Sequence, residues 1–85
     1  MKDTLLYLLS HIVDHPDALT VEESKEDEGH SVLTIHAHEE DMGKIIGKAG
    51  RIIRAIRDLI KCMATKDNVY VDVVLAEIEN PTAGV

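Results

Sequence analysis

Length, composition and charge place this chain of 85 residues among small globular domains, with 45% hydrophobic residues and enough length for one core. The formal net charge is −7 and there is no Trp or Phe, so a module that stacks bases on several exposed aromatic rings is not expected. One cysteine excludes an intramolecular disulfide, and no signal peptide or membrane-spanning stretch is apparent. These features predict a cytoplasmic protein.

A helix is predicted at the N-terminus, where Asp3 or Thr4 can cap it. Its apolar residues fall on one face: Leu5, Leu6, Leu8, Leu9, Ile12 and Val13. Pro16 ends the helix, and residues 14–17 are expected to form a loop.

Two strands follow, over residues 19–25 and 31–38, joined by a turn at residues 26–29. In the second strand Leu33, Ile35 and Ala37 alternate with polar residues and are expected to face the core. The two strands are predicted to pair as an antiparallel hairpin.

The second half of the chain is predicted to hold two helices and a strand. Residues 39–41 are acidic, which favours a helix start, and this helix runs through Ile46 to Gly47. The next helix has the clearest 3.6-residue period, formed by Ile52, Ile53, Ile56, Leu59, Ile60 and Met63. A last strand covers residues 68–75, with inward-facing side chains from Val69, Val71, Val73 and Leu75.

The predicted order is therefore α-β-β-α-α-β, an α+β fold with a three-stranded sheet and helices packed on one face. We expect one domain over residues 1–78 and a flexible tail over residues 79–85.

The segment between the last two helices carries the strongest functional pattern, Gly47-Lys48-Ala49-Gly50. Glycine at both ends lets the backbone turn sharply and approach a ligand closely, and the helix that begins after it favours an anion. Residues 44–66 contain seven basic residues and one acid, a local charge of +6, whereas the rest of the chain carries −13. Such segregation predicts a cationic face that binds a nucleic-acid backbone.

With its flanks, the stretch Ile45-Ile46-Gly47-Lys48-Ala49-Gly50-Arg51-Ile52-Ile53 resembles the central motif of KH domains, and the element order is that of type II. The resemblance extends to residues 12–17, 41–44 and 54–57, which are similar to the small stand-alone bacterial KH proteins of the KhpA family. It implies RNA binding with little sequence preference, a role in post-transcriptional regulation or RNA chaperoning, and a homodimer or a heterodimer with a larger KH-containing protein of the KhpB type.

The expected RNA site combines the glycine turn, nearby cations and an apolar floor: Lys44, Ile45, Ile46, Gly47, Lys48, Ala49, Gly50, Arg51, Ile53, Arg54 and Arg57. At least one of the isoleucines is expected to serve the core instead, and Asp58 is positioned to pair with Arg54 one turn away.

Three other kinds of site fit the sequence less well: a nucleotide-binding loop, a metal site and a catalytic site. A nucleotide P-loop starting at Gly43 is one residue short and lacks the hydroxyl that would hold Mg²⁺. His36 and His38 share a strand face and could bind a metal with His30 or Glu39, but we expect polar surface and no metal. No nucleophile–base pattern is present, so the chain is expected to be no enzyme.

Cys62 is expected to pack beside the helix core rather than to react. An alternative function remains open: the long apolar helix that ends near Met63 would make a dimer surface, and the domain would then scaffold a larger RNA-binding partner.

Overall fold

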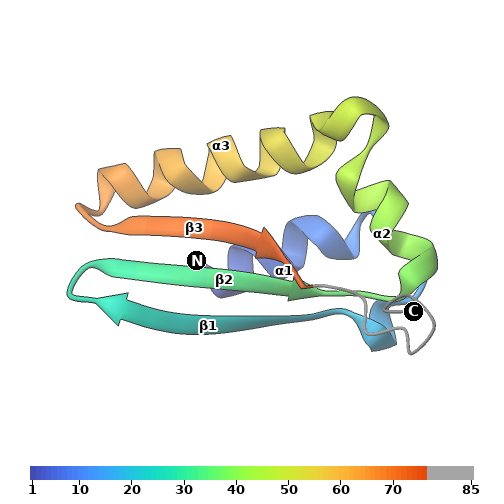
Figure 1. Ribbon diagram of the computed structural model, residues 1–85, viewed down its shortest axis with the longest axis horizontal. Coiled ribbons are helices and arrows are strands. Elements are labelled where there is room, and N and C mark those ends of the chain that lie inside the picture. The colour runs from blue at the N-terminus through green and yellow to red at the C-terminus, as the bar shows by residue number, and fades with distance from the viewer. Residues whose placement is uncertain (77–85) are drawn as a thin grey trace, which may run out of the picture.

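The computed structural model describes residues 1–76 and has the predicted element order (Figure 1). The predicted tail at residues 79–85 lies outside the described residues. The elements are α1 (Lys2–Ser10), the short 3₁₀ helix η1 (Pro16–Ala18), β1 (Thr20–Asp27), β2 (His30–His36), α2 (Glu39–Ile46), the 3₁₀ turn η2 (Lys48–Gly50), α3 (Arg51–Lys66) and β3 (Tyr70–Leu75). Within the described range, no helix is long and apolar enough to cross a membrane.

The sheet has the strand order β1-β2-β3, with β2 in the centre. β1 and β2 form the predicted antiparallel hairpin, whereas β3 runs parallel to β2. A parallel neighbour requires a long crossover connection, and α2 and α3 provide it. The hairpin turn is tighter than predicted because β1 continues to Asp27, past an irregularity in pairing between Lys25 and Asp27.

One hydrophobic core lies between the sheet and the helices. Figure 1 shows α1 behind the strands and α3 alongside β3. The alternation predicted for the strands is confirmed in their centres, where Leu33, Ile35, Val71 and Val73 are buried. The prediction for Val69 was wrong: it precedes β3 and is exposed, because the strand begins only at Tyr70.

The N-terminal helix begins and ends earlier than predicted. Met1 is its N-cap, and no side chain caps it, so the predicted caps Asp3 and Thr4 both lie inside the helix. Asp3 still complements the helix dipole in the first turn. The helix ends at Ser10, well before Pro16, and Pro16 instead opens η1.

Helix α3 presents two apolar stripes rather than one. The stripe in the core consists of Ile53, Ile56, Ile60 and Ala64, and the second, exposed stripe consists of Ile52, Leu59 and Met63. Cys62 is also exposed, so the expectation that it packs beside the core was wrong. Because α3 contacts the sheet along one side only, the residues one position away from the core stripe face outward.

Candidate nucleic-acid interface

Three of the four residues in the turn between α2 and α3 have positive φ: Gly47, Ala49 and Gly50. Gly47, which ends α2, has φ 76° and ψ 172°. Ala49 has φ 58° and Gly50 has φ 73°, both in the left-handed region. The Gly50 N–H donates to the Gly47 carbonyl at 3.1 Å, which closes the turn. The chain therefore turns sharply within four residues, as the Gly-x-x-Gly pattern predicts (Figure 1).

Gly47 is required for two physical reasons. Its backbone conformation is one that residues with a side chain rarely adopt. A Cβ at this position would also lie 2.5 Å from Cγ1 and 2.8 Å from Cβ of Ile52. Gly50, by contrast, faces open space, so only its positive φ favours glycine. The close approach of Gly47 to Ile52 is what brings the end of α2 against the start of α3.

The turn exposes free hydrogen-bond donors beside positive charge. Across residues 1–76, the backbone N–H groups of Lys48 and Ala49 have no hydrogen-bond partner, and no side chain caps α3. The side chains of Lys48, within the turn, and of Arg51, directly after it, are exposed. Free N–H groups in a turn just before a helix, close in the chain to two cations, form a site suited to a phosphate.

The other cations predicted to contact RNA differ in whether another residue of the chain already holds their side chains. Arg54 is exposed and makes no ion pair with Asp58 in the described structure, contrary to the pairing considered from the sequence. Lys44 pairs with the Asp14 carboxylate, and this contact raises the pKa of Lys44 above its usual value. Arg57 uses its Nε to donate to the Val73 carbonyl at 2.9 Å.

The three isoleucines predicted to form the apolar floor, Ile45, Ile46 and Ile53, differ in their burial. Ile45 is fully buried and Ile53 nearly so, and both belong to the core cluster. The exposed fraction of Ile46 is 37%, so it offers apolar surface beside the turn. The prediction that at least one isoleucine serves the core is confirmed.

The free edge of β3 is a feature that sequence reasoning missed. The N–H groups of Tyr70 and Ala76 donate toward the β2 side, so the backbone groups of alternate residues between them point to the other edge. The carbonyl of Val73, which accepts from Arg57, is one of these. The edge therefore has backbone donors and acceptors that no other strand pairs, and Arg57 of α3 occupies one of them, the Val73 carbonyl. Only the sheet order could reveal it, since the sequence does not tell which strand is at the edge.

A buried carboxylate, Asp41, fixes the start of α2. Its side chain is 1% exposed and accepts from the backbone N–H groups of Asp14 and His15, at 3.0 and 2.9 Å. Burial disfavours the charged form, but these bonds and the contact with the His15 ring outweigh it, and the pKa of Asp41 lies below its ordinary value of 3.8. From the sequence Asp41 is only one of three acids at a helix start, and no local pattern distinguishes it.

The histidines considered from the sequence do not gather into one cluster. His36 lies 3.4 Å from a carboxylate oxygen of Glu22, and His30 lies 3.4 Å from one of Asp72. His38 follows the end of β2 and caps α2, where its Nδ1 accepts from the Glu40 N–H at 3.1 Å. The predicted shared strand face of His36 and His38 was therefore wrong.

The parallel pairing of β3 with β2, and a Gly-x-x-Gly turn inside the helical crossover between them, are the architecture of a type II KH domain, and this chain has it. The sequence model of the KhpA/KhpB KH domain matches residues 2–75. The chain belongs to the KhpA/KhpB family.

Relatives named RNA-binding protein KhpA match most of the chain. The protein from Clostridium acetobutylicum is 43% identical over 68 residues, which is 80% of this chain and 89% of the relative. That from Halalkalibacterium halodurans is 42% identical over 67 residues, 78% of this chain and 86% of the relative. That from Chlamydia caviae is 39% identical over 79 residues, 91% of this chain and 97% of the relative. The family is one of binding proteins rather than enzymes.

Proposed function

We propose that this chain binds single-stranded RNA through the Gly47–Gly50 turn and the start of α3. The observation that carries the proposal is the pair of unpartnered N–H groups of Lys48 and Ala49, held in a positive-φ turn between two exposed cations. A phosphate seated there accepts from the backbone and is neutralised by Lys48 and Arg51. The names of the relatives, which are RNA-binding proteins, support the same conclusion.

The bases of the strand would then lie over α3 toward the free edge of β3. Ile46 offers an apolar surface near the turn, and Arg54 follows Arg51 along the exposed side of α3. Backbone groups along β3 provide hydrogen-bonding partners for base edges. Since the chain has no Trp or Phe, stacking adds little, and we expect low sequence specificity. Such binding suits a cytoplasmic role in post-transcriptional regulation or RNA chaperoning.

Affinity for an isolated strand should be weak and dependent on salt. The net charge of −7 repels RNA at long range, while the cations near the turn attract it locally. About three to five phosphate contacts would give a slope of about −2 to −3.5 for log K against log salt on a single strand.

The proposal is tested by fluorescence anisotropy of a labelled single-stranded RNA with the wild type and the variant K48D/A49D, at two salt concentrations. A matched control, S24D/K25D, makes the same change in charge at two adjacent exposed residues of β1. Circular dichroism checks that all three proteins fold. We expect salt-dependent binding that K48D/A49D loses and the control retains. Equal binding by both variants would place the RNA elsewhere.

A second function, as a protein-interaction subunit, is favoured by the exposed stripe of α3. Leu59 is 54% exposed at the middle of the stripe, between Ile52 and Met63. We propose that a second copy of the chain, or a larger KH-containing protein of the KhpB type, covers this stripe. Apolar side chains at helical spacing suit packing against another helix. A dimer would also double the cationic surface available to one RNA.

A further inference from the structure

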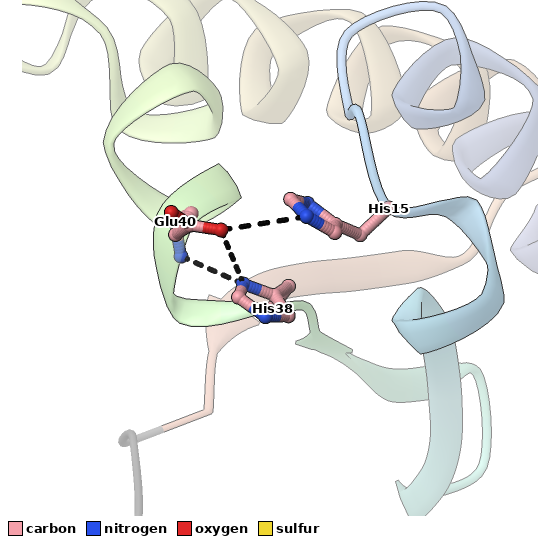
Figure 2. Close-up of side chains that lie close together, drawn as sticks. All are labelled: His15, His38 and Glu40. Atoms are coloured by element: carbon pink, nitrogen blue, oxygen red, sulfur yellow. Dashed lines mark hydrogen bonds and ion pairs between the residues drawn. The ribbon is translucent and has the colours of Figure 1, made fainter.

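A cluster of three side chains lies at the start of α2, away from the glycine turn at its other end (Figure 2). His15 comes from the segment before η1, His38 caps α2, and Glu40 lies in the first turn of α2. Glu40 Oε1 is 3.4 Å from His15 Nε2 and 3.7 Å from His38 Nδ1. One ligand atom from each residue lies within 4.8 Å of the other two.

The hydrogen bonds around the cluster determine which atoms carry lone pairs. Asp41 Oδ2 lies 3.2 Å from His15 Nδ1, and a carboxylate can only accept, so in the neutral ring Nδ1 carries the hydrogen and Nε2 the lone pair. His38 Nδ1 accepts from the Glu40 N–H, so it also carries a lone pair. Both of these lone-pair atoms face the same carboxylate oxygen of Glu40. Three acceptors around one point repel each other unless a proton or a metal cation lies between them.

The spacing of these atoms suits a metal ion. Zn²⁺ binds imidazole nitrogen and carboxylate oxygen at about 2.0–2.2 Å in a tetrahedral arrangement, which sets neighbouring ligand atoms about 3.3–3.5 Å apart. The observed separations of 3.4 and 3.7 Å are close to that range. The carboxylate of Asp41 behind His15 is the partner that metal-binding histidines usually have on their other nitrogen.

The two rings need one adjustment. They are stacked with centroids 4.0 Å apart and an angle of 13° between their planes, whereas two nitrogens on one ion need converging directions. The Asp41 contact holds His15, but the side chain of His38 is 38% exposed and has room to tilt. An ion would then bind the lone pair of His38 Nδ1 that now accepts from the Glu40 N–H, and this N–H would donate to water instead.

We propose that His15, His38 and Glu40 bind a divalent transition-metal ion of the zinc class, with water as the fourth ligand. Imidazole and carboxylate ligands are common for this ion, and the carboxylates of Glu40 and Asp41 add the negative charge that favours a cation. The bound ion links the segment before η1 to the start of α2. The proposal is independent of RNA binding.

The test is calorimetry of Zn²⁺ binding to the whole metal-free protein near neutral pH. We compare the wild type with H38Q and E40Q, and with the controls H36Q and E39Q, which replace residues of the same type outside the cluster. One Zn²⁺ should bind per wild-type chain. Loss of an outer partner alone lowers metal affinity about 10–100-fold, so loss of a direct ligand should lower it at least about tenfold, and the controls should bind normally.

A second measurement uses only the wild type, so its result does not depend on whether a variant folds. Zn²⁺ should shift the imidazole nitrogen resonances of His15 and His38, and leave those of His11, His30 and His36 in place. At a hundred times the dissociation constant it should raise the melting temperature by at least about 10 °C. Absence of Zn²⁺ binding, equal affinity in cluster and control variants, or shifts confined to the other histidines would overturn the proposal.

Discussion

Replacing Gly47 by alanine tests the packing that forms the glycine turn. The new Cβ would stand 2.5, 2.8 and 2.9 Å from Cγ1, Cβ and Cδ1 of Ile52, and the Cβ is bonded to the backbone, so a change of rotamer cannot move it away. Backbone strain at this φ and ψ costs about 1–3 kcal/mol, and overpacking adds about 1–3 kcal/mol. Alanine also lowers the conformational entropy of the unfolded chain, which offsets about 0.4–1 kcal/mol of this cost. We therefore expect G47A to lower the free energy of unfolding by about 1–6 kcal/mol.

Gly50 supplies the matched control. Its φ is 73°, but an added Cβ would meet no atom within 4 Å. G50A therefore carries only the left-handed strain of about 1–2 kcal/mol, reduced by the same gain in the unfolded chain. Urea unfolding followed by circular dichroism measures both variants, and with an m value of about 1–3 kcal/mol/M the midpoint of G47A should fall by about 0.3 M or more.

The double variant G47A/I52A separates the clash from the strain. Removing Cγ1 and Cδ1 of Ile52 relieves two of the three contacts, while Cβ at 2.8 Å remains. We expect partial recovery relative to G47A, with a coupling energy of about 1–3 kcal/mol. If G47A is no less stable than G50A, or if I52A brings no recovery, the close approach of α2 and α3 at Gly47 does not determine the turn.

Three further predictions concern single side chains. Folding lowers the pKa of Asp41, so its carboxylate stabilises the native state fully above the unfolded pKa and loses this effect as pH falls through the lower folded pKa. The difference in urea midpoint between the wild type and D41N, measured with EDTA, should therefore be largest near pH 7 and shrink below about pH 4. A difference that stays constant with pH would contradict this. R54Q should reduce the salt slope of RNA binding by about 0.7 and leave the free energy of unfolding unchanged. R57Q should lower the free energy of unfolding by about 1 kcal/mol because Arg57 donates to the Val73 carbonyl, and equal stability of the two variants would refute this distinction. L59E should convert a dimer to a monomer in analytical ultracentrifugation while T65E, also exposed on α3, does not, and a wild type that is monomeric at high concentration would exclude the homodimer.

Much of the fold follows from local rules that the sequence carries. The alternation at Leu33 and Ile35 places the inner face of β2, since successive strand residues point to opposite sides. The 3.6-residue period of Ile53, Ile56 and Ile60 specifies α3 in the same way. The glycine turn is also local, because the conformations of Gly47 and Gly50 depend on the absence of a side chain.

The tertiary structure decided what depends on contacts between distant residues. Ile52 and Leu59 carry the same periodic signal as the core residues of α3, yet they are exposed because the sheet covers only one side of the helix. Lys44 is predicted from the sequence to contact RNA, but Asp14, thirty positions away, pairs with it in the structure. The same holds for His15.

His15 and His38 are separated by a loop and a hairpin, and only folding stacks their rings at 4.0 Å. Residues within one turn or one strand are set by backbone geometry, so the sequence by itself determined the element order, the hairpin and the sharp Gly47–Gly50 turn. The buried carboxylate of Asp41, the free edge of β3 and the His15–His38–Glu40 cluster arise from packing between elements, and packing is decided only when the whole chain has folded.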